Sequence, residues 1–237
     1  MTTIAANLQV VRSRIARAAR AAHRPESDIE LLAVSKTWPA GRIIEAYADG
    51  QHAFGESYAQ EAVIKITEVE SLLARTGAPL RDLEWHFIGP VQSNKTRAIA
   101  KRFAWVHCVE REKTAVRLND ARPDGMPPLN VCIEVNVSGE ASKRGIAPGG
   151  ELALARAVAR LPRLRLRGLM AIPEPTTDAG LQRRRFARLR EMRDRLNAEG
   201  LALDTLSMGM SDDLESAILE GATIVRVGTA IFGQRAG

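Results

Sequence analysis

Apolar and polar residues follow two different periods along the chain. Short runs rich in Val, Ile and Leu alternate with segments in which apolar residues recur every three or four positions. The short runs predict strands buried on both faces, and the spaced pattern predicts amphipathic helices. The predicted strands are 30–36, 52–54, 84–88, 105–109, 130–137, 164–172, 203–208 and 223–227.

Helices are predicted before the first strand and after each of the first seven strands. The first helix is expected to pack on the domain through Ile4, Leu8, Val11 and Ile15. The remaining helices are predicted at 41–48, 57–74, 92–102, 112–121, 151–159, 179–198 and 211–219. On the helix over 57–74, the residues expected on one face are Tyr58, Ala62, Ile66, Val69 and Leu73.

The alternation of strands and helices defines the expected fold class. Right-handed crossovers between successive strands predict a parallel sheet, and eight such units favour a closed (β/α)8 TIM barrel. The competing fold is an open doubly wound sheet, but the glycine-rich dinucleotide fingerprint is missing after the first strand. No linker or change of composition divides the chain, so residues 1–237 are expected to form a single domain.

The composition is that of an ordinary soluble protein, with 45% hydrophobic and 26% charged residues. No apolar run is long enough to cross a bilayer. The first residues are rich in Ala and Arg and lack acids until Glu26, which superficially matches an organellar transit peptide, but the pattern also suits an amphipathic helix, and we expect this segment to be part of the fold. Cys108 and Cys132 lie in apolar runs without zinc spacing, which favours reduced thiols and a cytoplasmic location.

The formal charge of +6 raises the question of an anionic partner. Aromatic residues make up only 4% of the chain, and no RNA- or DNA-binding motif is present. The arginines concentrate on the first helix and on the segment 183–195, where solvated helix faces explain them. We therefore expect no nucleic-acid or membrane partner, and the absence of an exposed apolar stripe favours a monomer.

Lys36 ends the first predicted strand. Burial at that point disfavours the charged form of the amine and lowers its pKa, which makes it a nucleophile suited to a Schiff base with a carbonyl compound. The alternative is a lysine whose amine simply reaches solvent from a strand end.

Two loops at the same edge of the predicted barrel suit a phosphate group. In the loop after the seventh strand, Ser211 opens a predicted helix, where N–H groups and the helix dipole attract an anion. Ser211 could instead be only an N-cap, and the neighbouring Asp212 and Asp213 would repel a phosphate unless they point outward. After the eighth strand, Gly228 and Thr229 offer two N–H groups and a hydroxyl.

Arg226 lies within the eighth strand and points to the same side as Ile224 and Gly228. A buried guanidinium needs a partner, either a carboxylate such as Glu134 or a polar ligand in the barrel mouth. A reactive lysine, a phosphate cradle and an interior arginine together fit pyridoxal 5′-phosphate (PLP). The histidines show no metal-ligand spacing, although His86 could line the mouth.

Six segments closely resemble the pyridoxal phosphate homeostasis proteins, the YggS/PROSC family, and the likeness covers nearly the whole chain. They are 31–37 (LLAVSKT), 54–56 (FGE), 85–95 (WHFIGPVQSNK), 167–173 (RGLMAIP), 207–213 (SMGMSDD) and 225–233 (VRVGTAIFG).

The resemblance implies a barrel like the N-terminal domain of alanine racemase, with PLP held as a Schiff base on Lys36. It also implies that Arg226 faces the pyridine nitrogen. The phosphate contacts would come from Ser211, Gly228 and Thr229, and Ser207 of the same motif is a further cofactor-binding candidate. The family usually has asparagine at the position of Ser57, which leaves a cofactor contact there in doubt.

Two functions are compatible with these residues. The family is understood to hold PLP and pass it on, which makes PLP-dependent apo-enzymes the expected recipients. The alternative is an amino-acid racemase, which needs a base on each face of the cofactor. Racemases of this fold take one base from a tyrosine of a further domain, whereas Tyr47 and Tyr58 lie on predicted helices here. A Schiff-base aldolase is less well supported, and Lys143 is either a second amine at the mouth or a solvated loop lysine.

Overall fold

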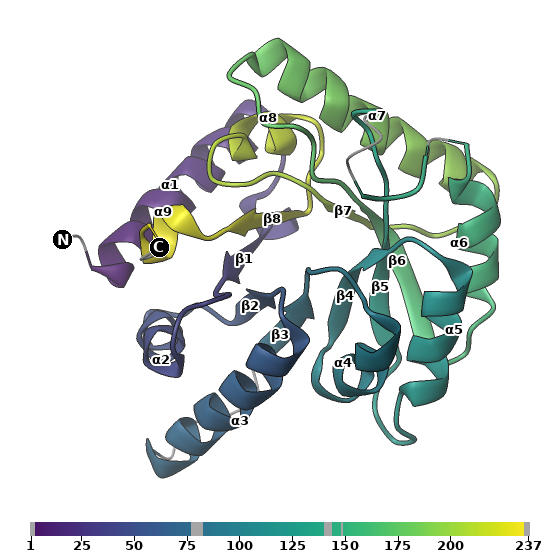
Figure 1. Cartoon of the computed structure of the whole chain (residues 1–237). Coiled ribbons are helices and arrows are strands. Elements are labelled where there is room, and N and C mark those ends of the chain that lie inside the picture. The colour runs from purple at the N-terminus through teal and green to yellow at the C-terminus, as the bar shows by residue number, and fades with distance from the viewer. Residues whose placement is uncertain (1–2, 77–82, 140–143, 148, 235–237) are drawn as a thin grey trace.

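Eight parallel strands pair edge to edge until the last returns to the first, which closes the barrel that the sequence predicts (Figure 1). The computed structural model describes residues 3–76, 83–139, 144–147 and 149–234. The strands are β1 (Glu30–Val34), β2 (Ala53–Glu56), β3 (Glu84–Phe87), β4 (Trp105–Val109), β5 (Leu129–Glu134), β6 (Leu164–Met170), β7 (Thr205–Ser207) and β8 (Ile224–Val227).

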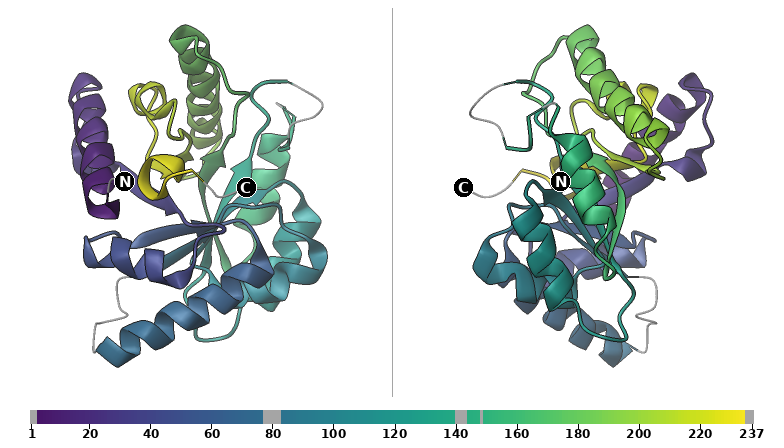
Figure 2. Two further views of the ribbon diagram at one scale, coloured as in Figure 1. Left: turned by 60° about the vertical axis from the view of Figure 1, so that its left-hand side comes forward. Right: turned by 90° about the vertical axis from the view of Figure 1, so that its right-hand side faces the viewer.

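Helices surround the barrel on its outer side (Figures 1 and 2). They are α1 (Ile4–Ala21), α2 (Ala40–Ala48), α3 (Ala59–Thr76), α4 (Thr96–Arg102), α5 (Glu112–Ala121), α6 (Glu151–Ala159), α7 (Ala179–Ala198), α8 (Leu214–Leu219) and α9 (Thr229–Phe232), with 3-10 turns at Glu26–Asp28 and Ser93–Lys95. Among the described helices, none combines the length and the apolar character that a membrane crossing requires.

The pairing of β1 with β8 brings together segments from opposite ends of the sequence. Leu32 is in register with Arg226, and Ala33 is in register with Val227. Just beyond this pair, a Cβ atom added to Gly228 would lie 3.2 Å from the carbonyl oxygen of Val34. The loop that carries Lys36 therefore begins directly beside the loop that follows β8.

Helix α1 packs against α2, α8 and α9 and so covers the closure of the barrel. Its predicted apolar face is confirmed, because Ile4, Leu8, Val11 and Ile15 are all buried. The Thr3 hydroxyl accepts a hydrogen bond from the Ala6 N–H and caps the first turn. The amphipathic pattern at the start of the sequence is therefore part of the fold.

Some predicted boundaries are wrong, for local reasons. Tyr58 precedes α3 and is 54% exposed, so it does not belong to the buried face. Strand β7 begins two residues late because the Asn197 amide hydrogen-bonds both the N–H and the carbonyl of Leu203. Helix α8 begins at Leu214 rather than Ser211, and the Asp213 carboxylate accepts the Met210 N–H at 2.6 Å in the preceding turn.

Candidate functional site

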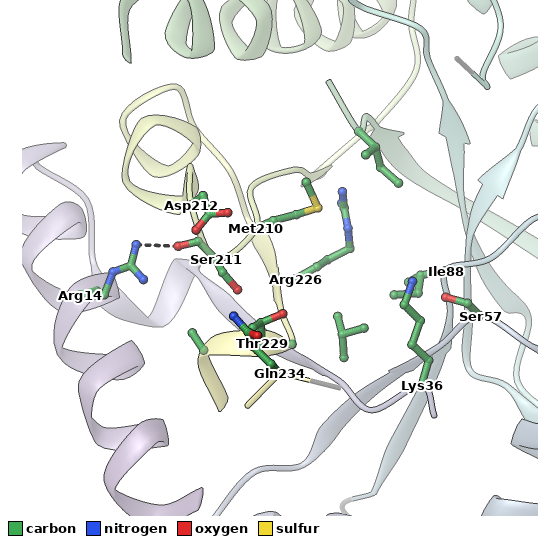
Figure 3. A pocket seen from close by; sticks show the side chains of 14 residues that line it. Arg14, Lys36, Ser57, Ile88, Met210, Ser211, Asp212, Arg226, Thr229 and Gln234 are labelled. Atoms are coloured by element: carbon green, nitrogen blue, oxygen red, sulfur yellow. Dashed lines mark hydrogen bonds between the residues drawn. The ribbon is translucent and has the colours of Figure 1, made fainter. Parts of the chain in front are cut away.

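A cavity of about 580 Å³ opens at the carboxyl ends of the strands (Figure 3). Six of the predicted site residues line it: Lys36, Ser57, Ser211, Arg226, Gly228 and Thr229. The other lining residues are Arg14, Val34, Ile88, Ile172, Met210, Asp212, Ala230 and Gln234. Two predicted residues, Ser207 and His86, are buried in the barrel and lie outside this lining. Lys143 lies outside the described residues.

The backbone on both sides of Lys36 is held by an ion pair from α3. Lys65 Nζ donates to the carbonyl oxygen of Ser35 at 2.9 Å and to Glu61 Oε1 at 2.8 Å. The N–H of Thr37 donates to the same Glu61 oxygen at 2.7 Å. Thr37 has a φ of 69°, which is rare for a β-branched residue, so these contacts maintain an uncommon backbone conformation. The loop therefore presents Lys36 in a fixed position.

A second carboxylate, Glu56, lies beneath this loop and is fully buried. Its Oε1 accepts hydrogen bonds from Ser35 Oγ at 2.7 Å and Lys65 Nζ at 2.8 Å, while its Oε2 has no hydrogen-bond partner among the described residues. Burial raises the pKa of Glu56, and the nearby Lys65 ammonium opposes that rise. Lys65 is not among the residues predicted for the site, although its spacing from Ala62 and Val69 places a charge on the apolar face of α3.

The opposite wall of the cavity carries Ser211 and Thr229 (Figure 3). Gly228, which precedes Thr229, is packed against Val34, so a side chain at this position would meet the wall of the barrel. Two hydroxyl groups and the backbone of a glycine-containing turn thus face the cavity across from Lys36. This is the wall that the sequence analysis assigns to a phosphate.

Arg14 of α1 fixes the loop that carries Ser211. Its Nη2 donates to the carbonyl oxygen of Ser211 at 2.9 Å, and its guanidinium forms two hydrogen bonds with Glu215, of 2.7 and 2.8 Å. The loop turns sharply at Gly209, which has a φ of 94° and has no space for a Cβ atom beside Ala217. Sequence spacing alone assigned Arg14 to a solvated helix face, because it does not reveal the approach of α1 to this loop.

Arg226 lies between the two walls (Figure 3) and is only 4% exposed. Its Nη1 donates to Ser207 Oγ at 2.6 Å, and its Nη2 donates to the carbonyl oxygen of Ala171 at 2.9 Å. Burial lowers the pKa of Arg226 to about 10. Its hydrogen-bond partners among the described residues are Ser207 and Ala171, and it forms no ion pair with Glu134, so the cavity contact is the alternative that the geometry favours.

Ser207 and His86 lie below Arg226. Ser207 Oγ is bonded to Arg226 and to His107 Nδ1, the latter at 2.7 Å. His86 is in register with Trp105, the first residue of β4, and its side chain is buried inside the barrel rather than in the lining of the cavity. Its ring nitrogens instead contact His107 and Glu84.

A model of the alanine racemase N-terminal domain family matches residues 5–236 of the chain. The pyridoxal phosphate homeostasis protein of Pseudomonas aeruginosa is 59% identical over 235 residues, which cover 99% of this chain and 97% of the relative. The chain belongs to the pyridoxal phosphate homeostasis protein family. Another member, from Escherichia coli K12, is 52% identical over 238 residues, which cover 99% of this chain and 98% of the relative.

Solved structures agree with the family and with the fold. PipY of Synechococcus elongatus, solved with PLP bound, has a TM-score of 0.82 and 36% identity, and the match covers 98% of this chain and all of PipY. Alanine racemase of Clostridium difficile has a TM-score of 0.70 and 15% identity, over 98% of this chain and 57% of the racemase. The racemase likeness shows that this family shares the racemase barrel, as the resemblance implied.

Proposed function

We propose that the chain binds PLP as a Schiff base on Lys36 and passes it to PLP-dependent apo-enzymes without catalytic turnover. The observation that carries this proposal is the lysine amine on one wall of the cavity, with hydroxyl and backbone donors on the opposite wall and Arg226 between them. The family of the chain and the PLP-bound structure of PipY support the same cofactor. Strands from both ends of the sequence build the cavity, so we propose that the whole chain acts as one cofactor-binding domain.

The residues present fit the cofactor. The cavity volume of about 580 Å³ is within the range of small-molecule sites. Ser211 and Thr229 supply hydroxyl groups for a phosphate, and Gly228 lets that group approach the backbone closely. Arg14, which also lines the cavity, keeps the Ser211 loop in place. Ser57, on the same side as Lys36, supplies a third hydroxyl.

Arg226 supports binding rather than catalysis. Bound PLP would supply an aldehyde for the lysine and a pyridine ring able to withdraw electrons. A guanidinium has only donors and stays protonated, so it can donate to the ring nitrogen but cannot give up a proton to it. The ring then withdraws electrons less strongly, which disfavours bond breaking at a bound amino acid.

The racemase alternative requires a second base on the other side of the cofactor. Of the described residues that line the cavity, Lys36 supplies an amine and none is a tyrosine. Tyr58 is 54% exposed and Tyr47 belongs to α2, and neither lines the cavity. These positions support a carrier more than a racemase.

Replacement of Lys36 tests the covalent attachment. We expect the purified protein to be yellow after incubation with PLP and to lose its long-wavelength absorption band on borohydride reduction. Lys36→Ala should remove that band, because none of the other described residues that line the cavity is a lysine. Lys113→Ala, an exposed lysine on α5, is the matched control and should keep the spectrum. An unchanged band in Lys36→Ala would place the attachment elsewhere.

Turnover is tested separately with the PLP-loaded protein. L- and D-amino acids are incubated with it and then separated by chiral chromatography. The expected rate does not exceed that of free PLP. A rate that exceeds it and disappears in Lys36→Ala would favour the racemase.

A further inference from the structure

A line of hydrogen-bonded polar side chains fills the barrel axis beneath Arg226. Arg226 Nη1 lies 2.6 Å from Ser207 Oγ, which lies 2.7 Å from His107 Nδ1. His107 Nε2 lies 2.9 Å from His86 Nδ1, and His86 Nε2 lies 2.8 Å from Glu84 Oε1. Barrel interiors are ordinarily filled by branched apolar residues, and a buried polar network is costly unless every member is satisfied. This line of five residues, the axial chain, therefore calls for an explanation.

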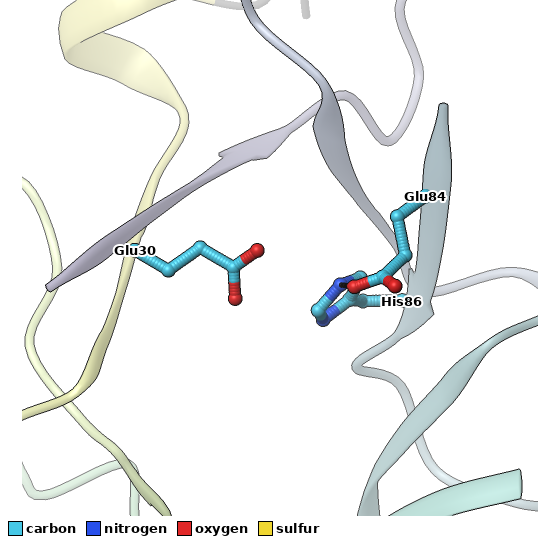
Figure 4. Close-up of side chains that lie close together, drawn as sticks. All are labelled: Glu30, Glu84 and His86. Carbon is cyan, nitrogen blue, oxygen red and sulfur yellow. Dashed lines mark hydrogen bonds and ion pairs between the residues drawn. The ribbon is translucent and has the colours of Figure 1, made fainter. Parts of the chain in front are cut away.

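The axial chain connects the two ends of the barrel. Arg226 lines the cavity at the carboxyl end, whereas Glu84 is the first residue of β3 at the amino end. The side chain of Glu84 is 42% exposed, while Ser207, His107 and His86 are completely buried. Figure 4 shows the exposed end, with Glu84 beside the ring of His86 and Glu30 facing them from β1. A solvent-accessible carboxylate is thus bonded, through three buried groups, to the arginine of the cavity.

The chemistry of the two end groups fixes the direction of every bond. A guanidinium only donates, so Ser207 Oγ accepts from Arg226. An ionised carboxylate only accepts, so His86 carries its proton on Nε2. In a neutral ring His86 Nδ1 must then accept from His107 Nε2, and His107 Nδ1 accepts the Ser207 hydroxyl proton. Every donor meets an acceptor while both rings stay neutral.

The electrostatics agree with this assignment. Burial lowers the pKa of His107 well below its ordinary value, and a positive charge on His86 or Arg226 lowers it further. The hydrogen bond from His86 lowers the pKa of Glu84, which keeps that carboxylate ionised. The indole of Trp105 also donates to Glu84 and stacks on the His86 ring at a centroid distance of 5.3 Å. The exposed end of the axial chain is therefore held by hydrogen bonds from two side chains, His86 and Trp105.

We propose that Ser207, His107, His86 and Glu84 are positioning residues that orient Arg226 toward the cofactor. They also couple the contact between Arg226 and the cofactor to protonation at the opposite end of the barrel. The proposal rests on the proposed function, since it takes the pyridine ring of PLP to lie against Arg226. If His86 gains a proton, both its nitrogens donate, so His107 must accept at Nε2 and donate from Nδ1 to Ser207. The Ser207 hydroxyl proton then loses its acceptor, and Ser207 Oγ receives donors from both sides, which loosens its bond to Arg226.

Other charged or titratable groups lie near both ends of the axial chain. Glu30 of β1 and Arg167 of β6 act on the Glu84 end, where the Arg167 guanidinium lies 4.7 Å from the Trp105 ring centre. The groups that act on Arg226 are Asp213, Glu134, Cys132 and Cys108. At the Glu84 end, a carboxylate oxygen of Glu30 lies within 4.8 Å of a carboxylate oxygen of Glu84 and of a ring nitrogen of His86, yet Glu30 is no member of the axial chain. It therefore provides a matched control for the charge of Glu84.

The first test needs no cofactor. In protein with nitrogen-15-labelled histidine, the side-chain nitrogen shifts identify which ring atom is protonated. We expect neutral rings protonated at Nε2 for both His86 and His107 at pH 8, with His86→Gln and His107→Gln used for assignment. Ser207→Ala should shift the His107 Nδ1 resonance, and Ser207→Thr should restore it. A His107 ring protonated at Nδ1 at pH 8 would overturn the proposed direction of the axial chain.

The second test measures PLP binding and the spectrum of the bound cofactor between pH 5 and 9. Ser207→Ala should weaken PLP binding about tenfold through loss of one charge-assisted hydrogen bond, and Ser207→Thr should restore it. Glu84→Gln, which lies outside the cavity, should shift the pH midpoint of the spectrum, whereas Glu30→Gln should shift it much less. Equal shifts in these two variants would mean that any negative charge near His86 has the same effect, whether or not it belongs to the axial chain, and would overturn the proposal. A wild-type protein that binds no PLP would instead contradict the proposed function, while the histidine result stands independently.

Discussion

Glu134 is a carboxylate that folding makes harder to ionise. Burial raises its pKa from 4.5 to about 7, although Arg226 and Arg144 oppose the rise. Between these two values the folded state binds more protons than the unfolded state, so this residue makes stability fall as pH increases from about 4.5 to 7. The resulting decrease in the free energy of unfolding is fully present above pH 7 and is about 3 kcal/mol, since one pKa unit corresponds to about 1.4 kcal/mol.

Glu134→Gln should therefore stabilise the cofactor-free protein at pH 8, by up to about 3 kcal/mol, and much less at pH 5. Urea unfolding at the two pH values measures the difference. Glu112→Gln, on the exposed first turn of α5, is the control and should change stability little at either pH. A gain of the same size at pH 5 and pH 8 would show that ionisation of Glu134 is not its cause.

Individual residues differed in how far the sequence could predict them. Lys36, Ser211 and Gly228 follow directly from strand ends, because parallel strands place those ends at one edge of the barrel. The bond between His107 and Ser207 could not be predicted in the same way. These residues are separated by 100 positions and belong to β4 and β7, so their contact depends on the register of strands across the barrel.

At the scale of elements, α1 contributes to the cavity through Arg14. Arg14→Met should weaken PLP binding about tenfold, because the loop that carries Ser211 loses a charged hydrogen bond and Glu215 loses its partner. Equilibrium titration with PLP, followed by absorbance, measures the change. Arg20→Ala on the same helix is exposed and serves as the control. The attachment to Lys36 should survive in Arg14→Met, and equal affinities of the two variants would refute a role for Arg14.

Element types were more predictable than element ends. The apolar runs identify all eight strands because a parallel barrel buries both faces of each strand. Their ends depend on side chains from other elements, as Asn197 of α7 shows when it takes both backbone groups of Leu203. Helix α9 was not predicted at all, since its four residues are too few for a helical period to be visible.

At the scale of the whole molecule, the cavity unites β1 with β8 and the first helix with the last loops. A ligand held between these segments should stabilise the closure of the barrel and hence the entire fold. Binding to the folded state alone adds about 2.7 kcal/mol at a ligand concentration one hundred times the Kd. For a chain of this size, that corresponds to an increase in Tm of roughly 5–10 °C.

Thermal unfolding with and without PLP tests this expectation. The wild-type protein should unfold in one transition that PLP moves upward as a whole, because both ends of the sequence contribute to the same cavity. Lys36→Ala should show a much smaller increase, and pyridoxal without the phosphate should also give a smaller one, since the wall formed by Ser211, Gly228 and Thr229 is then not engaged. If PLP moved only part of the transition, the two ends of the chain would not unfold together. If pyridoxal stabilised the protein as much as PLP, the phosphate assignment of that wall would be wrong.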